Sequence, residues 1–504
     1  MTYLSAILGA VVVAAIVLVA KSRHFRRSLP PGPKGLPIVG NINDLDGNEI
    51  HVQARKWSQE YDSDIVSITT LGHTTVFLNS AQAIQDLFVS RGAIYSDRPD
   101  MPMLIDLMGW DWTFALMRYG QKWKEHRRIF HEQFNNTISE HRQIQIPAAL
   151  ELLQLLNKSP DRFLDHLEHY VSRIIMKRVY GYDFEDAMKD PYVLVNKAAS
   201  ESTSTATVPG TFLVDTFPIL KYVPEWVPGA GFQKIAKKWR KLQEAVVHGA
   251  YDMVVEQQKQ GASNASFVGT CLEDRAQNLP EALSEDAIKS IAAVVYAAGS
   301  DTNLATLTCF VLAMVLHTDV QKRLQAEIDS VTDGERLPTF EDKEELPYFM
   351  DVFREVMRWL VVFPVAIPHR ATTEDSYKGY YIPKDSTIIG NSWAVLHDPV
   401  TYPDPETFNP DRFVKDKSLP DPMDIAAFGY GRRSCSGKAM AIDTVWIAMA
   451  TMLTVYDMEK PLNKEGKPVD PIVAFRRAAI NHPAPFDCRF VPRSKARLAL
   501  LQQD

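Results

Sequence analysis

Apolar residues recur at three- and four-residue spacing through long stretches of the chain, which is the pattern of helices with a buried face. Two runs of β-branched residues, 65–70 and 75–78, flank Gly72 and His73 and predict a β-hairpin. After residue 360 the pattern changes to short strands and proline-rich coil. The chain is therefore predicted to be mainly α with a small β portion, with helices at about 119–157, 161–180, 232–258, 284–317, 318–332, 345–360 and 437–455.

Residues 4–20 carry no charge, and their number lies near the lower limit for a helix that crosses the hydrocarbon core of a membrane. Four basic residues follow between 21 and 27 and none precedes, which predicts a single N-terminal transmembrane helix with the remaining chain in the cytosol. A cleaved secretory signal peptide is the alternative, but its positive n-region is missing. The expected segments are a membrane anchor at 1–21, a basic and proline-rich linker at 22–40, and one folded domain at 41–504.

The composition narrows the class of protein. With 504 residues, 46% hydrophobic and 23% charged, the chain is too apolar for wholesale disorder and too polar for a protein with many membrane spans. The net charge of −7 gives no electrostatic basis for a nucleic-acid partner. The four cysteines contain no CxxC pair, so neither a disulfide framework nor a zinc knuckle is indicated.

One cysteine stands apart from the others. Cys435 lies in the glycine-rich segment 428–437, directly before an apolar helix. Glycines allow positive φ angles and the close approach of a flat cofactor, and main-chain N–H groups at a helix start stabilise a thiolate. This pattern favours a metal ligand at Cys435, whereas Cys271, Cys309 and Cys488 are interpreted as buried apolar residues.

A polar interruption at residues 298–302 divides the apolar helix predicted at 284–317. Burying the Asp301 carboxylate and the Thr302 hydroxyl without hydrogen-bond partners would cost roughly several kcal/mol. A cavity that holds water and a reacting oxygen would give both groups hydrogen-bond partners. The alternative is a kinked core helix in which the Thr302 hydroxyl bonds back to a carbonyl.

The pattern Phe-x-x-Gly-x-Arg-x-Cys-x-Gly at 428–437 resembles the haem-ligating signature of the cytochrome P450 superfamily, and every fixed position matches. Glu355 and Arg358 resemble its Glu-x-x-Arg pair, and Arg412 resembles the arginine that joins this ion pair. The resemblance implies the cytochrome P450 fold, haem b (iron protoporphyrin IX) held by an axial Cys435 thiolate, and a proton relay through Asp301 and Thr302. Two positions depart from the usual family residues, Asn303 after Thr302 and Ser436 after Cys435.

The same resemblance implies further contacts with haem. Two propionates need cationic donors, and arginine gives the best geometry for a carboxylate. The matching positions are Trp123, Arg127, His369, Phe428, Arg433 and Gly437. A solvated surface charge is the alternative for Arg127, Arg433 and especially His369.

Segments that face substrate in the resembled family are apolar here. The candidates for the substrate pocket are Leu104, Trp110, Val295, Val365 and Ile367. Such residues are more often core than pocket individually, but together they predict a hydrophobic, ring-bearing substrate, either a terpenoid, a polyketide or an indole. Longer stretches are similar to fungal monooxygenases of secondary metabolism, such as the tryptamine 4-monooxygenase and O-methylsterigmatocystin oxidoreductase-like groups.

The function implied is a haem-thiolate monooxygenase that uses O2 and electrons from an NADPH-dependent FAD/FMN cytochrome P450 reductase. Lys124, Arg128, Arg432 and Lys438 are candidates for a cationic surface that binds this partner. The expected location is the endoplasmic reticulum membrane, single-pass, with the catalytic domain on the cytosolic side. The alternatives are a thiolate-haem isomerase or dehydratase that needs no reductase, and a non-catalytic haem sensor or carrier.

Overall fold

The computed structural model describes residues 29–44, 49–208, 210–262, 264–279, 283–476 and 479–502. The predicted membrane anchor at 1–21 and the basic start of the predicted linker lie outside the described residues. Within the described ranges, two helices are long and apolar enough to cross a membrane, α12 (Glu285–Leu316) and α18 (Lys438–Val455). Most of each is buried inside the protein, as in the core helices of a soluble domain.

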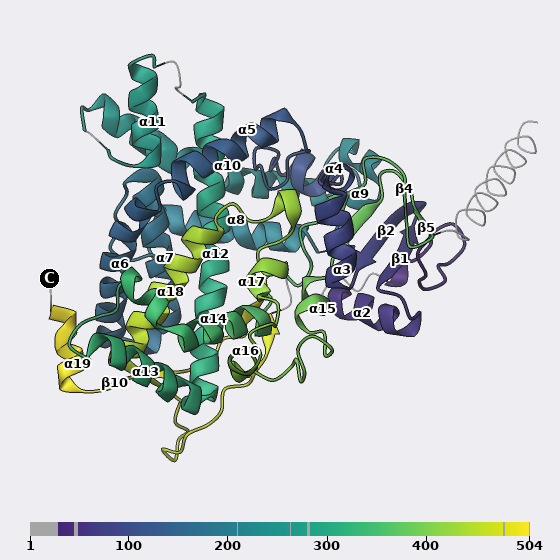
Figure 1. Cartoon of the computed structure of the whole chain (residues 1–504). Coiled ribbons are helices and arrows are strands. Elements are labelled where there is room, and N and C mark those ends of the chain that lie inside the picture. The colour runs from purple at the N-terminus through teal and green to yellow at the C-terminus, as the bar shows by residue number, and fades with distance from the viewer. Residues whose placement is uncertain are drawn as a thin grey trace, which may run out of the picture.

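Figure 1 shows a large helical body beside a smaller part that carries β1, β2, β4 and β5. Helix α12 runs through the middle of this body and packs against α7 (Phe163–Tyr180), α10 (Gly231–Lys259) and α18. It begins after Ser284, whose hydroxyl accepts a hydrogen bond from the Ala287 N–H, and acidic residues occupy its first turn, where the helix dipole favours them. The largest apolar cluster of the described residues surrounds α7, α12 and α18.

The other helices form the rest of the body and flank the strands. In the body they are α5 (Gln121–Phe130), α6 (Ile138–Lys158), α8 (Pro191–Ala206), α11 (Phe267–Ala276), α13 (Thr318–Thr332), α14 (Pro347–Trp359), α16 (Asp411–Lys415), α17 (Pro422–Ile425) and α19 (Lys495–Ala499). Near the strands they are α2 (Ile50–Glu60), α3 (Ala81–Ile84), α4 (Gly92–Tyr95), α9 (Leu213–Thr216) and α15 (Ser392–Leu396). Short helical turns connect them: η1 (Ile42–Asp44), η2 (Gln85–Ser90), η3 (Pro102–Leu107), η4 (His131–Asn135), η5 (Pro160–Arg162), η6 (Pro218–Tyr222), η7 (Phe340–Glu345), η8 (Gly431–Arg433) and η9 (Leu500–Gln502).

The main sheet has the strand order β1–β2–β6–β3. Strands β1 (Ile65–Thr70) and β2 (His73–Leu78) pair antiparallel, with Ile65 opposite Leu78, so the predicted hairpin is confirmed. Strand β6 (Thr387–Gly390) pairs parallel with β2, and β3 (His369–Arg370) pairs antiparallel with β6. Residues far apart in sequence are thereby joined, and β3 places His369 in the interior.

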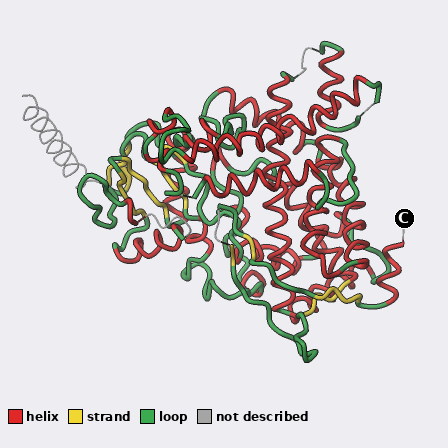
Figure 2. The backbone as a smooth tube through the Cα atoms, turned by 180° about the vertical axis from the view of Figure 1, so that it is seen from behind, coloured by secondary structure: helices red, strands yellow, loops and turns green. Residues whose placement is uncertain are grey.

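Three two-stranded ribbons complete the strands: β4 (Asp375–Tyr377) with β5 (Tyr380–Ile382), β7 (Tyr456–Glu459) with β10 (Arg489–Pro492), and β8 (Phe475–Arg476) with β9 (His482–Pro483). Figure 2 shows that helix dominates and that the strands lie in separate small groups. The mainly α prediction is confirmed, and each predicted helical range contains one or more helices. Helices α2, α8 and α11 fall outside those ranges, as do the shorter α3, α4, α9, α15, α16, α17 and α19.

Candidate active site

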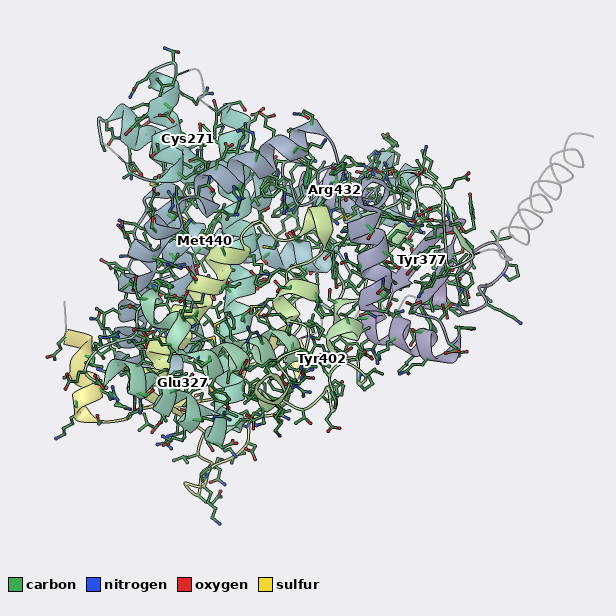
Figure 3. All side chains as sticks on the ribbon, viewed as in Figure 1. Cys271, Glu327, Tyr377, Tyr402, Arg432 and Met440 are labelled. Atoms are coloured by element: carbon green, nitrogen blue, oxygen red, sulfur yellow. The ribbon has the colours of Figure 1, made fainter. Side chains whose placement is uncertain are left out.

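An interior cavity of about 280 Å³ lies where α5, α12 and the loop before α18 meet the segment after α14. Its walls are mostly apolar and aromatic, which excludes water and favours a hydrophobic ligand. Apolar lining residues include Phe114, Phe130, Val295, Ala298, Phe363 and Ile480. In Figure 3, Arg432 and Met440, which lie on either side of Cys435 in the sequence, mark the two ends of this region: Arg432 lies toward the strand-bearing part, and Met440 lies on α18 within the helical body.

The segment before α18 holds Cys435 in a tight turn against the cavity. The Cys435 N–H donates to the Phe428 carbonyl (2.7 Å), and Gly429 and Gly431 have φ angles of 73° and 50°. A Cβ at Gly431 would lie 2.3 Å from the Phe88 carbonyl oxygen, so this turn requires glycine there. Cys435 and Phe428 both line the cavity, and the turn directs this one cysteine toward it.

Two opposing effects act on the Cys435 thiol. Burial raises the pKa of Cys435, while the Gly437 N–H and the positive charges of Arg127 and Lys438 act to lower it. The other described cysteines are buried elsewhere; burial raises the pKa of Cys271 to about 12 and raises the pKa values of Cys309 and Cys488 still further. Figure 3 shows Cys271 on α11, well away from Met440 at the start of α18. A metal or cofactor in the cavity therefore meets a thiol at Cys435.

Three guanidinium groups meet at one side of the cavity. Arg433 donates to the carbonyls of Ser96 and Met117 (2.7 Å each), and Arg127 donates to the carbonyl of Ser434 (2.8 Å). The Arg433 and Arg127 guanidinium carbons lie 4.6 and 5.7 Å from the Trp123 ring centre, so Trp123 packs against both. Sequence analysis predicted these three residues at a cofactor, and the structure brings them together at the cavity.

The third guanidinium belongs to Arg98, which the sequence analysis missed. Arg98 is 3% exposed and donates to the carbonyls of Ile367, Pro368 and Ala115 (2.6–2.8 Å). It lies outside every recognised motif, in a run of ordinary polar residues, so the sequence carries no signal that it would be buried. It lines the same cavity as Arg127 and Arg433.

These arginines carry uncompensated positive charge. In the described part of the chain, none of the three is ion-paired with a carboxylate; Asp97, which lies nearby in sequence, pairs instead with Arg370 and Arg118. Burial and the neighbouring Arg127 charge lower the pKa of Arg433 to about 10, and burial together with the Arg433 charge lowers the pKa of Arg98. Buried charges of one sign are costly unless an anion neutralises them. The arginine cluster therefore favours a ligand that bears more than one negative charge.

His369 and Gly437 complete the predicted cofactor contacts. His369 lines the cavity, its Nδ1 lies 2.6 Å from the Tyr95 carbonyl, and its ring stacks on Phe88 at 4.0 Å between centres. Burial and the Arg98 charge lower its pKa, so the imidazole is neutral near pH 7. Gly437 also lines the cavity and precedes the first residue of α18.

The polar interruption in α12 presents its two side chains in different directions. Thr302 lines the cavity, and its hydroxyl donates to the Ala298 carbonyl (2.9 Å), which is the back-bonded arrangement considered as the alternative. Asp301 is not among the cavity-lining residues; its carboxylate binds His482 (2.9 Å) and the Ser200 hydroxyl (2.8 Å). Burial acts to raise the pKa of Asp301, but these two partners outweigh it and hold the pKa below its usual value.

Glu355, Arg358 and Arg412 form a buried ionic network. Arg358 binds Glu355 through two bonds of 2.8 Å, and the Arg412 Nε lies 3.1 Å from the same carboxylate. Both arginines also donate to the Thr407 carbonyl (3.2 Å), and Glu355 and Arg358 are fully buried. The network ties α14 to the chain around residues 403–412, upstream of the cysteine turn.

The predicted substrate residues separate into two groups. Val295 and Ile367 line the cavity. Leu104 and Trp110 belong instead to an apolar cluster between η3, α8 and α10, and Val365 packs beside α2 and β2. Other cavity-lining residues, Val294 and Ala298, lie one position before and three after Val295, so the helical period of α12 was the signal that would have found them.

Comparisons with known proteins agree with this geometry. A family model described as Cytochrome P450 matches residues 30–484. A cytochrome P450 monooxygenase of Armillaria gallica is 51% identical over 98% of this chain and 99% of its own length. The tryptamine 4-monooxygenase of Psilocybe cyanescens is 38% identical over 97% of this chain and 98% of its own. A cytochrome P450 monooxygenase of Coprinopsis cinerea is 39% identical, over 96% and 92%.

Proposed function

Because this chain belongs to the cytochrome P450 family, whose monooxygenases hold haem b through a cysteine thiolate, we propose that it hydroxylates an uncharged, hydrophobic, ring-bearing secondary metabolite with O2. The observation that carries the proposal is the coincidence, in one apolar cavity, of a single cysteine and a cluster of unpaired arginines. Membrane anchoring through the predicted segment at 1–21, in the endoplasmic reticulum with the domain at 41–504 on the cytosolic side, is part of the proposal.

The residues at the cavity fit haem b. Cys435 would supply the thiolate ligand, and Arg98, Arg127 and Arg433, with Trp123 and His369, would hold the two propionates, whose negative charge would neutralise the buried arginines. Phe428 and Gly437 bound the same space. The remainder of the lining is mostly apolar, which suits a porphyrin and an apolar substrate.

Bound haem supplies the iron at which O2 is reduced, so that one oxygen atom enters the substrate and the other leaves as water. The Cys435 sulfur would hold that metal and supply it with electron density. The apolar walls from α12 and from residues 362–367 exclude water and hold one C–H bond of the substrate within reach, and proximity selects the carbon that reacts. Thr302 turns its hydroxyl from the Ala298 carbonyl toward the cavity to deliver a proton.

Replacing Thr302 with alanine is expected to uncouple NADPH oxidation from product formation. The change removes the Thr302 hydroxyl from the cavity wall, while the cysteine turn and the arginine cluster stay intact. Product per NADPH should fall severalfold and peroxide should rise, with the haem spectrum unchanged. Thr308→Ala is the matched control, because its hydroxyl also bonds back along α12, to Leu304 (2.8 Å), outside the cavity. A fully coupled Thr302→Ala enzyme would refute the assignment.

Replacing Arg98 with glutamine is expected to weaken haem retention by about 10- to 100-fold, the usual cost of losing a positioning contact around a bound metal group. The measurement is the rate at which haem passes to a scavenging apoprotein. Arg91→Gln is the control, because Arg91 is more exposed and pairs with Asp375 (2.7 Å) away from the cavity. Equal haem loss from both variants would contradict a propionate contact at Arg98.

The cavity distinguishes between classes of substrate. Among the described residues that line it there is no aspartate or glutamate. A protonated amine such as tryptamine would have no carboxylate to bind, and burying its charge without a partner would be unfavourable. Neutral indoles, sesquiterpenes and polyketides should therefore displace the sixth iron ligand of the purified enzyme, as seen in the haem absorption spectrum. A response to protonated tryptamine alone would overturn this assignment.

Electron supply separates the monooxygenase from its alternatives. We expect product to require NADPH and a flavoprotein reductase, whereas an isomerase or dehydratase would turn over without them and a haem sensor would give no steady O2 consumption. The proposed docking surface contains Lys124, Arg128, Arg432 and Lys438. Arg128 and Lys438 already pair with the exposed Glu132 and Asp424, so acidic residues of a partner would have to displace these contacts.

A further inference from the structure

The carboxylate of Asp301 lies where three elements meet. Asp301 belongs to α12, His482 belongs to β9, and Ser200 belongs to α8. The His482 Nε2 is 2.9 Å from one carboxylate oxygen, and the Ser200 hydroxyl donates to the other (2.8 Å). Both oxygens are therefore engaged on the side of α12 away from the cavity, although the next residue, Thr302, lines the cavity.

The partner at β9 is an imidazole, which can both donate and accept a proton. Imidazole is the side chain that ordinarily changes charge between pH 5 and 8, whereas a serine hydroxyl does not. The His482 and Asp301 side chains are 21% and 25% exposed, so the pair has contact with solvent. Ile480, two residues before His482, lines the cavity, so β9 lies beside both the solvent-exposed pair and the cavity wall.

Other charges near this carboxylate are already paired. Lys197, on α8, also favours the ionised form of Asp301, but it makes its own ion pair with Glu168 of α7 (2.7 Å). His482 is thus the titratable group in hydrogen-bond contact with Asp301 among the described residues.

We propose that His482 passes protons from solvent to Asp301 during turnover, as the outer member of the proton path. The N–H bond at Nε2 of the imidazolium breaks and an O–H bond forms on Asp301; the neutral imidazole keeps its Nδ1–H and regains a proton from water at Nε2 once the protonated carboxyl has turned away. The protonated carboxyl, released from the imidazole, turns toward Thr302 and returns to the carboxylate when it gives up the proton. This inference rests on the proposed monooxygenase function, and His482 acts as a positioning and proton-supplying residue, without contact with substrate.

Three variants distinguish a proton-supplying role of His482 from a role in which it only orients the Asp301 carboxylate. His482→Gln retains an N–H donor for Asp301 but cannot carry a proton. Ser200→Ala removes a hydrogen bond from the same carboxylate without changing any titratable group. His248→Gln, on the exposed face of α10, is the control for loss of a histidine elsewhere. Each is assayed as the holoenzyme with reductase, for product per NADPH between pH 6 and 8.

In the wild type, product per NADPH should fall as pH rises, because the proposed step consumes a proton that His482 takes from solvent. His482→Gln should give a severalfold lower ratio that no longer changes with pH, with more peroxide, whereas Ser200→Ala and His248→Gln should keep the wild-type slope. The same slope in His482→Gln, or its loss in Ser200→Ala, would overturn the proposal.

A second readout does not depend on turnover. The ¹⁵N signals of the His482 ring in the resting holoenzyme, assigned by their absence in His482→Gln, should shift when Asp301 is replaced by asparagine. Unchanged signals would overturn the contact itself. If the wild type gives no reductase-dependent product while the His482 ¹⁵N signals do shift, the proposed function is wrong but the His482–Asp301 contact is retained. If product forms but product per NADPH still changes with pH in His482→Gln, only the proposed proton path is wrong.

Discussion

Replacing Cys435 with alanine is expected to reduce reductase-supported product to background and to abolish the thiolate-type spectrum of the ferrous carbonyl complex. The turn from 428 to 437 places this sulfur against the cavity, and the other described cysteines are buried elsewhere, so the fold offers no substitute ligand. Without thiolate, electron density that favours O–O cleavage is lost. Absorbance of the carbonyl complex and product yield measure both effects.

Cys488→Ala provides the comparison for this variant. Cys488 is 7% exposed, and burial raises the pKa of its thiol, so it is inert as a ligand. It should retain the thiolate-type spectrum and full product yield, with only a small loss of packing energy. A thiolate-type spectrum that survives in Cys435→Ala would show that another residue holds the iron.

Replacing Glu355 with glutamine is expected to lower the free energy of unfolding by about 3–5 kcal/mol, the usual cost of breaking a buried ion pair. The substitution leaves Arg358, which is fully buried, and Arg412, which is 7% exposed, without their shared carboxylate. Since this network ties α14 to the chain before the cysteine turn, haem retention should fall as well. Denaturant unfolding followed by circular dichroism and by haem absorbance measures the two losses.

Asp411→Asn is the matched control for the ionic network. Asp411 pairs with Arg323 at 2.7 Å, close to Arg412 in sequence, but both side chains are more than 40% exposed. Its loss should cost less than about 1 kcal/mol, because solvent screens surface ion pairs. Equal destabilisation by Asp411→Asn and Glu355→Gln would contradict a special role for the buried network.

The sequence predicted the elements whose patterns are strong and local. Helix α12 is apolar over almost its whole length, and the β1–β2 hairpin has β-branched residues on both sides of a glycine turn, so both were predictable. Helix α8 was not, because its second half is rich in serine and threonine, which favour caps and turns in isolation. Tertiary packing against α10 and α12 stabilises it as a helix.

For the site, motif spacing identified Cys435 and the residues that the structure gathers with it, but not the direction of each side chain. Asp301 and Thr302 are adjacent in sequence, and one residue of an α-helix turns the next side chain by about 100°, which separates their partners. Arg98 and His482 reach their positions through contacts with distant segments, which no local pattern predicts. The substrate candidates Leu104 and Trp110 share the apolar character of cavity residues, and only the packing of η3 against α8 and α10 separates them from the cavity.

X-ray absorption at the iron K-edge of the purified full-length protein tests the central assignment most directly, because it reports the atoms bonded to the metal. We expect one sulfur neighbour of iron in the wild type, beside the porphyrin nitrogens, and its disappearance in Cys435→Ala. An iron shell of nitrogen and oxygen alone in the wild type, or a sulfur neighbour that persists in the variant, would contradict the account.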